Sequence, residues 1–136
     1  MDYNCWIRTN YFAVTDEDTF LKTINECLAN GSMEVITQEE KDRTRYGFLC
    51  EGSIFGSDEG EGCGDFDSFI KSLQEILPPG EAILLQEIGH EGFRYLVGSV
   101  LIITANDVRY VNMQAKALEE ARILLDNDDF ETQMEY

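Results

Sequence analysis

The length, composition and charge of the chain indicate a folded, strongly acidic domain. Its 136 residues, 43% of them hydrophobic, suffice for one domain with a buried core, and eight Phe and six Tyr residues exclude an intrinsically disordered chain. The 27 acidic residues against 10 basic ones give a formal charge of −17. Because such a polyanion repels phosphates, we expect its partner to be a protein with a basic surface, and no direct contact with nucleic acid.

Neither the start of the chain nor its apolar runs resemble a targeting or membrane segment. No basic-then-apolar stretch opens the sequence, and no apolar run approaches the ~20 residues that span a bilayer. We therefore expect a cytoplasmic protein that makes no membrane contact. Cys5, Cys27, Cys50 and Cys63 form no CxxC pair, which favours free thiols and no bound metal or other cofactor.

The first half of the chain predicts a strand, a helix and a hairpin. The aromatic and β-branched run CWIRTNYFAV, residues 5–14, is typical of a strand. Thr15 and the three acids after it are typical of a helix start, and Asn30-Gly31 of a helix end. Its predicted inward face comprises Phe20, Leu21, Ile24, Cys27 and Leu28. Residues 33–37 and 46–55 predict two strands of an antiparallel hairpin around the polar turn QEEKDRTR.

The second half predicts two helices around three strands. Residues 66–77 predict a helix that Pro78-Pro79-Gly80 ends, and its predicted inward residues are Phe66, Phe69, Ile70, Leu73, Ile76 and Leu77. Residues 81–88, 93–104 and 108–111 predict strands. The final helix covers residues 114–125. Its predicted inward residues are Ala117, Leu118, Ala121, Leu124 and Leu125. We predict a single α+β domain, residues 1–136, with a mostly antiparallel sheet of about five to six strands and three helices packed against it.

Acidic residues gather in two stretches that contain no base. The first acidic cluster comprises Glu51 and the five acids of the acidic loop, residues 56–67. These five acids are Asp58, Glu59, Glu61, Asp65 and Asp67. The C-terminal acidic cluster lies in the tail, residues 126–136, and comprises Asp126, Asp128, Asp129, Glu131 and Glu135. Phe55, Phe130 and Tyr136 are interleaved with them. Carboxylates with aromatic anchors between them can occupy a groove of Lys and Arg, although solvated, solubilising charge is the alternative.

Neither stretch matches a metal or phosphate loop. An EF-hand loop requires oxygen ligands at alternate positions, but counting from Asp58 places Gly60 and Gly62 at the third and fifth. Counting from Asp126 places Phe130 at the fifth position. Carboxylates among the glycines would repel phosphate, and no GxxxxGK[ST] motif follows. We therefore expect no metal site and no phosphate site here.

Candidate catalytic groups are few. His90 is the sole histidine, between two predicted strands, with Glu87 and Glu91 near it in sequence. A His–carboxylate pair could act as a general base, but a turn histidine is usually structural, and no nucleophile motif accompanies it. We therefore rank an enzyme around His90 third, below the two hypotheses that close this section, and we expect no catalytic residue.

Several passages together carry a resemblance that spans most of the chain. NYFAVTDEDTF, YGFLCEGSIFG, LLQEIGHEGFRYLVGSVLIIT and the closing DDFETQMEY resemble small acidic proteins of phages and conjugative elements of gut Firmicutes, of the anti-CRISPR and antirestriction type. The resemblance implies a protein that a mobile element uses against host defence. Many such inhibitors work without catalysis, by presenting carboxylates where DNA phosphates would sit.

Two functional hypotheses follow for testing. The first is a non-enzymatic inhibitor of a defence nuclease, most simply a CRISPR effector, whose basic groove receives the two acidic clusters. The second is an accessory interaction module of a mobile element, which works through its apolar sheet face or as a homodimer while acidity serves solubility. Binding that weakens steeply with salt would indicate the first, and association that survives high salt the second.

Overall fold

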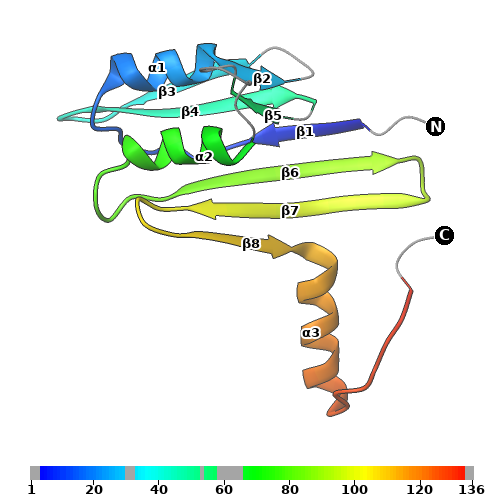
Figure 1. Ribbon diagram of the computed structural model, residues 1–136. Helices are drawn as coiled ribbons and strands as arrows, with labels where there is room; N and C mark the ends of the chain where they lie inside the picture. Colours follow the sequence, from blue (N-terminus) through cyan, green and yellow to red (C-terminus); the bar gives the residue numbers. More distant parts are fainter. Residues whose placement is uncertain (1–3, 30–32, 53, 58–65, 134–136) are drawn as a thin grey trace.

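The computed structural model describes residues 4–29, 33–52, 54–57 and 66–133. Its centre is a six-stranded antiparallel sheet with the order β3-β4-β1-β6-β7-β8 (Figure 1). The strands are β1 (Asn4–Arg8), β3 (Met33–Glu39), β4 (Thr44–Glu51), β6 (Ile83–Glu91), β7 (Tyr95–Ile103) and β8 (Val108–Asn112). Two short strands, β2 (Cys27–Ala29) and β5 (Ile54–Ser57), pair as a separate ribbon. The predicted α+β class with a mostly antiparallel sheet is confirmed.

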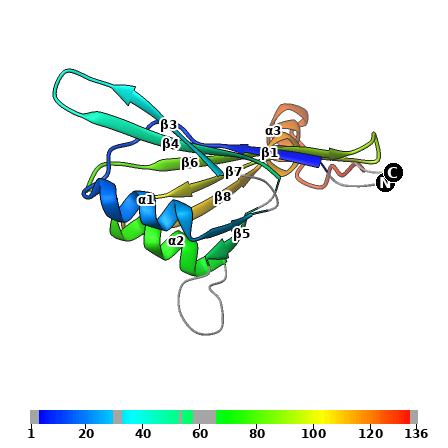
Figure 2. The same cartoon turned by 90° about the horizontal axis from the view of Figure 1, so that it is seen from above.

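Two helices cover one face of this sheet, and the third lies on the other side. Helices α1 (Glu17–Asn25) and α2 (Phe66–Glu75) lie side by side below the sheet in Figure 2, whereas α3 (Met113–Leu125) lies above it. The face opposite α1 and α2 is called the open face below. Helix α3 extends from the end of β8 past that edge of the sheet, away from α1 and α2 (Figure 1).

The core lies between α1, α2 and the half of the sheet that they cover. Phe12, Phe20, Phe48 and Phe69 are fully buried there, with ring centroids 5.7 Å apart for Phe12 and Phe20 and 6.0 Å for Phe48 and Phe69. All the predicted inward positions of α2 and of the turn after it are buried or half-buried. Burial of these large side chains is the main term that stabilises the fold.

Several predicted boundaries were wrong, each because tertiary pairing overrides local propensity. The first strand ends at Arg8 instead of residue 14, because the Thr9 hydroxyl accepts a hydrogen bond from the Phe48 amide and donates one to the Asn10 carbonyl. Helix α1 begins after Asp16 and ends at Asn25, and the next turn of the predicted helix is strand β2. Strand β4 ends at Glu51, since Gly52, at φ 114°, turns the chain toward β5.

The last two corrections concern the part of the chain that carries the candidate site. His90 lies inside β6 and not in a turn, because the β6–β7 hairpin turns at residues 92–94, where Gly92 has φ 57°. No residue of α3 is buried, so the predicted inward face of this helix was wrong for the isolated chain. Leu124 is 86% exposed and Leu125 56% exposed.

Candidate protein-interaction surface

Exposed large apolar side chains are concentrated in the second half of the chain. In the described part of the chain, they lie in β1, the β6–β7 hairpin, β8 and α3, and none lies in α1, α2, β3 or β4. They are Trp6, Leu84, Ile88, Phe93, Tyr95, Leu96, Val108, Tyr110, Val111, Met113, Ile123, Leu124 and Leu125. Single exposed apolar residues are ordinary, but a group of this size concentrated in neighbouring elements indicates a binding surface.

Strand register assigns many of these side chains to the open face. Ile88 is the cross-strand neighbour of both Trp6 and Gly98, and Gln86 is the neighbour of Val100, which in turn is opposite Val111. Because directly opposite residues share a face of a sheet, these side chains form one surface. The apolar patch, as we call it, comprises Trp6, Leu84, Ile88, Leu96 and Val111, continued by Met113 and Leu124 of α3.

A groove of about 520 Å³ lies between the open face and α3. The sheet contributes Ile88, Gly98 and Val100, and α3 contributes Met113 and Ala117. Gly98 permits the close approach of the helix, since a Cβ there would lie 3.0 Å from Met113 Sδ. Lys116 and Glu120 also line the groove, with their charged groups 3.1 Å apart, and Gln86, Glu87 and Ser99 contribute to a lining that combines apolar and polar residues.

Helix α3 is defined at both ends although no other element buries it. Asn112 accepts a hydrogen bond from the Ala115 amide at 2.9 Å and thereby caps the first turn. Asp126, in the left-handed conformation at φ 51°, ends the helix, and its amide donates to carbonyls of the last turn. The chain then turns back, and Arg122 Nε donates to the Phe130 carbonyl at 2.9 Å. The exposed apolar end of α3 is therefore a formed helix.

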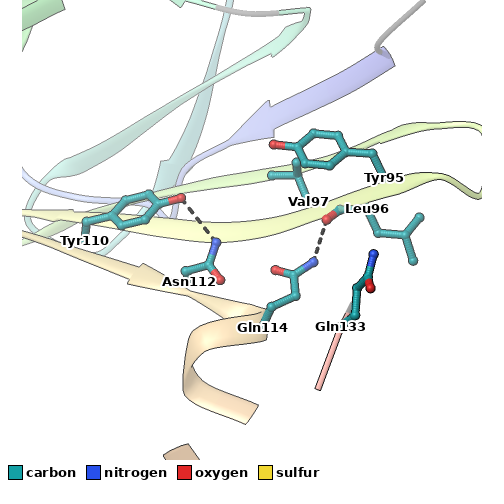
Figure 3. A pocket seen from close by; sticks show the side chains of 7 residues that line it. All are labelled: Tyr95, Leu96, Val97, Tyr110, Asn112, Gln114 and Gln133. Carbon is teal, nitrogen blue, oxygen red and sulfur yellow. Dashed lines mark hydrogen bonds between the residues drawn. The ribbon is translucent and has the colours of Figure 1, made fainter. Parts of the chain in front are cut away.

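A second, more polar pocket of about 310 Å³ lies where β7 and β8 meet the start of α3 (Figure 3). Asn112 Nδ2 lies 3.5 Å from the Tyr110 hydroxyl, and the Gln114 amide donates to the Leu96 carbonyl. Tyr95, Val97 and Gln133 complete the lining. None of the described residues that line it is charged, so it offers hydrogen bonds but neither an acid–base pair nor a nucleophile.

Only part of the first acidic cluster falls on described residues. Glu51 ends β4 opposite Trp6 and therefore lies on the open face, whereas Asp67 is exposed in the first turn of α2, on the other side of the sheet. Asp58, Glu59, Glu61 and Asp65, with most of the acidic loop, lie outside the described residues. The two described members thus do not share one surface.

The C-terminal acidic cluster follows α3. Asp126 is the helix cap, Asp128, Asp129 and Glu131 are exposed, and Glu135 lies outside the described residues. Across the described chain, none of these carboxylates, nor Glu51 or Asp67, is among the ion pairs that join an acid to a base within 4.0 Å. Their charge is therefore not neutralised by an ion pair of that kind.

Charge is distributed unevenly between the two parts of the chain. Residues 83–125, which hold β6 to α3, contain five acids and four bases, a formal charge of −1. The remaining residues therefore carry −16 of the total of −17. The segment that holds every exposed large apolar side chain of the described chain except Trp6 is thus close to neutral, although Glu51 lies opposite Trp6 and the acids from Asp126 onward directly follow the segment.

The structure does not assemble the candidate general base around His90. The His90 ring stacks on Trp6, with centroids 6.2 Å apart and an interplanar angle of 29°. Glu87 and Glu91 are three and one positions away in the same strand, and strand alternation points them to the opposite face. Glu91 instead lies 3.9 Å from Arg94. His90 is thus part of the aromatic edge of the open face.

Comparison with known proteins adds no relative. No family model, no curated protein and no solved structure matches the chain. Within the described residues, no group of three or more His, Cys, Asp or Glu side chains could hold a metal ion. No helix in the same residues is long and apolar enough to cross a bilayer.

An apolar sheet face was expected as the alternative binding surface, but none of its residues was predicted, although the sequence contains a signal for them. YLVGSVLII, the whole of β7, is apolar or small at nearly every position. A strand that is apolar on both faces is typical of a sheet covered on both sides. The run therefore predicts a covering layer on each face of the sheet. Helices α1 and α2 form only one of these layers, which leaves the other face to be covered by something else.

Proposed function

We propose that this protein works by binding another protein through its apolar patch, without catalysing a reaction. A single observation carries the proposal: all the exposed large apolar side chains of the described chain except Trp6 lie in residues 83–125, a segment with a formal charge of −1 in a chain of −17. Monomers seldom expose apolar patches beyond a few hundred Å², because the exposed area costs free energy and favours association. The protein is thus an interaction module, and we place it in the cytoplasm.

Capture experiments with matched variants test this function. Immobilised wild-type protein, Ile88→Asp and Phe93→Asp would each be incubated with cell lysate and with untagged wild-type chain, at 0.1 M and 1 M NaCl. Ile88 lies in the centre of the patch, and Phe93 is an 86% exposed residue at the tip of the hairpin, so both variants add the same charge. We expect Ile88→Asp alone to lose the captured protein, at both salt concentrations. Equal capture by all three would contradict the proposal.

A second candidate function uses the acidic part of the chain. The charge of −16 outside residues 83–125, together with exposed carboxylates that form no ion pair in the described chain, favours a partner with a basic groove. A nucleic-acid-handling protein of a defence system, most simply a CRISPR nuclease, has such a groove. In this candidate the protein is a non-enzymatic inhibitor that occupies the place of DNA.

Charge reversal with an equal-charge control tests the second candidate. Asp58, Glu59 and Glu61 would be changed to Lys, and the control would change Glu34, Asp42 and Glu75, exposed acids outside both clusters. The readout is DNA cleavage by a panel of CRISPR nucleases at increasing salt. We expect only the first triple variant to lose inhibition, and salt above about 0.1 M to weaken inhibition by the wild type. Inhibition that survives the first triple variant would exclude charge mimicry by this loop.

A further inference from the structure

Helix α3 carries one apolar stripe that only partly meets its own sheet. Met113, Ala117, Glu120 and Leu124 follow each other at intervals of four, three and four residues and therefore share one side of the helix. The first three line the groove against the open face, but Leu124, one turn farther on, is 86% exposed. The stripe thus continues past the edge of the groove without cover.

The chain therefore carries both halves of an interface. It has a groove on the open face, and it has a helix, α3, whose exposed Leu124 end projects past the β8 edge of the sheet (Figure 1). When two copies are related by a two-fold axis, α3 of each copy can lie in the groove of the other, and the same contact forms twice. This self-complementarity favours a second copy over an unrelated apolar partner.

Charge at this contact is lower than on the rest of the chain but is not zero. Residues 83–125 carry only −1 in each copy, whereas Glu51 lies opposite Trp6 on the open face and Asp126 directly follows the Leu124 end, so some carboxylates of the two copies would repel and salt should reduce that repulsion. The same near-neutrality makes the patch a poor site for a basic partner. Lys116 and Glu120 beside the groove carry opposite charges, so a two-fold axis can place Lys116 of one copy near Glu120 of the other.

The exposed area is large enough to form the centre of a dimer interface. From their exposed fractions, the seven side chains of the apolar patch present at most roughly 600–900 Å² in total, at about 150–250 Å² for a large aromatic side chain and less for an aliphatic one. A standard interface buries about 800 Å² on each partner, from about 20–30 residues. The patch therefore supplies the apolar centre of one side of such an interface, and the residues around it supply the rest.

We infer that the apolar patch is occupied by a second copy of this chain, in a two-fold dimer in which the Leu124 end of each α3 lies in the groove of the other copy. The second copy is the specific occupant of the docking surface proposed above, and this inference rests on that proposed function. Ile88 of one copy and Leu124 of the other are expected to lie at the centre of the contact.

Sedimentation equilibrium of the full-length protein tests the dimer. Wild type, Ile88→Asp, Leu124→Asp and the charge-matched control Phe93→Asp would be measured from 1 to 100 µM at 0.1 M and 1 M NaCl. We expect a wild-type dimer whose Kd is unchanged or lower at high salt, since screening reduces repulsion between acidic chains. Each patch variant should raise Kd at least 100-fold, while Phe93→Asp leaves it unchanged. Leu124 is so exposed that its variant should keep the native circular dichroism spectrum.

Three results would overturn the dimer: a wild type that is monomeric at 100 µM, a Leu124→Asp variant that dimerises as the wild type does, or oligomers larger than two. Binding of the apolar dye ANS separates this failure from that of the proposed function. A monomeric wild type that binds ANS, with binding lost in Ile88→Asp, overturns the dimer and leaves the docking surface standing. A monomer that binds no ANS overturns both.

Discussion

At the scale of single residues, Gly47 is the position where the fold has least room. A Cβ there would lie 2.9 Å from the Asn10 carbonyl oxygen, which is backbone and cannot move aside without shifting the chain. Gly98 is the matched control, because its Cβ would meet the flexible end of Met113 at 3.0 Å. We expect Gly47→Ala to lower the free energy of unfolding by about 1–3 kcal/mol and Gly98→Ala by less, measured by urea denaturation. Equal losses would show that the close approach at Gly47 carries no strain.

Cys27 shows what burial does to a thiol. Burial, and next the neighbouring Cys50, raises the pKa of Cys27 to about 12. At pH 8 only on the order of one molecule in 10,000 then holds the reactive thiolate, so we expect alkylation by iodoacetamide to be at least about 100-fold slower than in the urea-unfolded chain. Peptide mass mapping over time would measure both rates. Fast labelling of Cys27 in the native protein at pH 8 would contradict this environment.

The raised pKa of Cys27 also predicts how stability depends on pH. The folded pKa lies above the unfolded value of 9.0, so this thiol stabilises the native state fully below pH 9. That contribution is lost progressively as the pH rises from about 9 through 12. Cys27→Ser, which does not titrate in this range, should lose less stability than the wild type between pH 8 and pH 11 in parallel urea titrations. Parallel losses would assign the alkaline effect to other groups.

At the scale of elements, Asp16 is the N-cap residue that begins helix α1. Its carboxylate accepts hydrogen bonds from the Asp18 amide at 3.0 Å and the Thr19 hydroxyl at 2.8 Å. The Thr19 hydroxyl, followed by the Thr19 amide, lowers the pKa of Asp16 below its usual 3.8. The cap therefore stabilises the fold above pH 3.8, and this contribution is lost as the pH falls through the lowered pKa.

Replacing the cap tests that assignment. Asp16→Ala should lower Tm by about 2–6 °C at pH 7, whereas Asp16→Asn, which can still cap, should lower it less. Thermal melts followed by circular dichroism at pH 7 and pH 3 would measure both. The difference between wild type and Asp16→Asn should shrink at pH 3, because below pH 3.8 the unfolded chain takes up the proton more readily than the folded one. A difference that is the same at both values would remove the charge from the explanation.

Regular apolar spacing marks a buried face in helix α2 but an uncovered face in helix α3. In α2 the predicted inward residues do face the core, because the helix lies against the sheet beside α1. In α3 an equally regular spacing indicates a face that the single chain leaves uncovered. Periodicity states which residues share one side of a helix, but not whether the surface that covers them belongs to the same chain.

At the scale of the whole molecule, apolar and acidic surfaces occupy different parts of the chain. The two proposed modes of binding therefore respond to salt with opposite sign. Association through the apolar patch should persist or strengthen at 1 M NaCl, while binding of a basic groove by the acidic clusters should weaken steeply above about 0.1 M. Because Asp126 and the acids after it directly follow the Leu124 end of α3, the two modes use neighbouring parts of the chain, and the acidic loop lies farther from the dimer contact in sequence.

The amino-acid sequence alone determined the class of fold, the order of most elements and the acidity, because these depend on local periodicity, turn residues and composition. Helix α2, the hairpin of β3 and β4 and the strands β6 to β8 were all predicted within a few residues. Strand β2 was not, because Cys27 and Leu28 suit a helix until β5 pairs with them. Only the tertiary structure decided that α1 and α2 cover one face, that Trp6 and Ile88 are neighbours on the other, and that α3 lies beside them. Those facts depend on strand register and layer order, which contacts between distant parts of the chain establish.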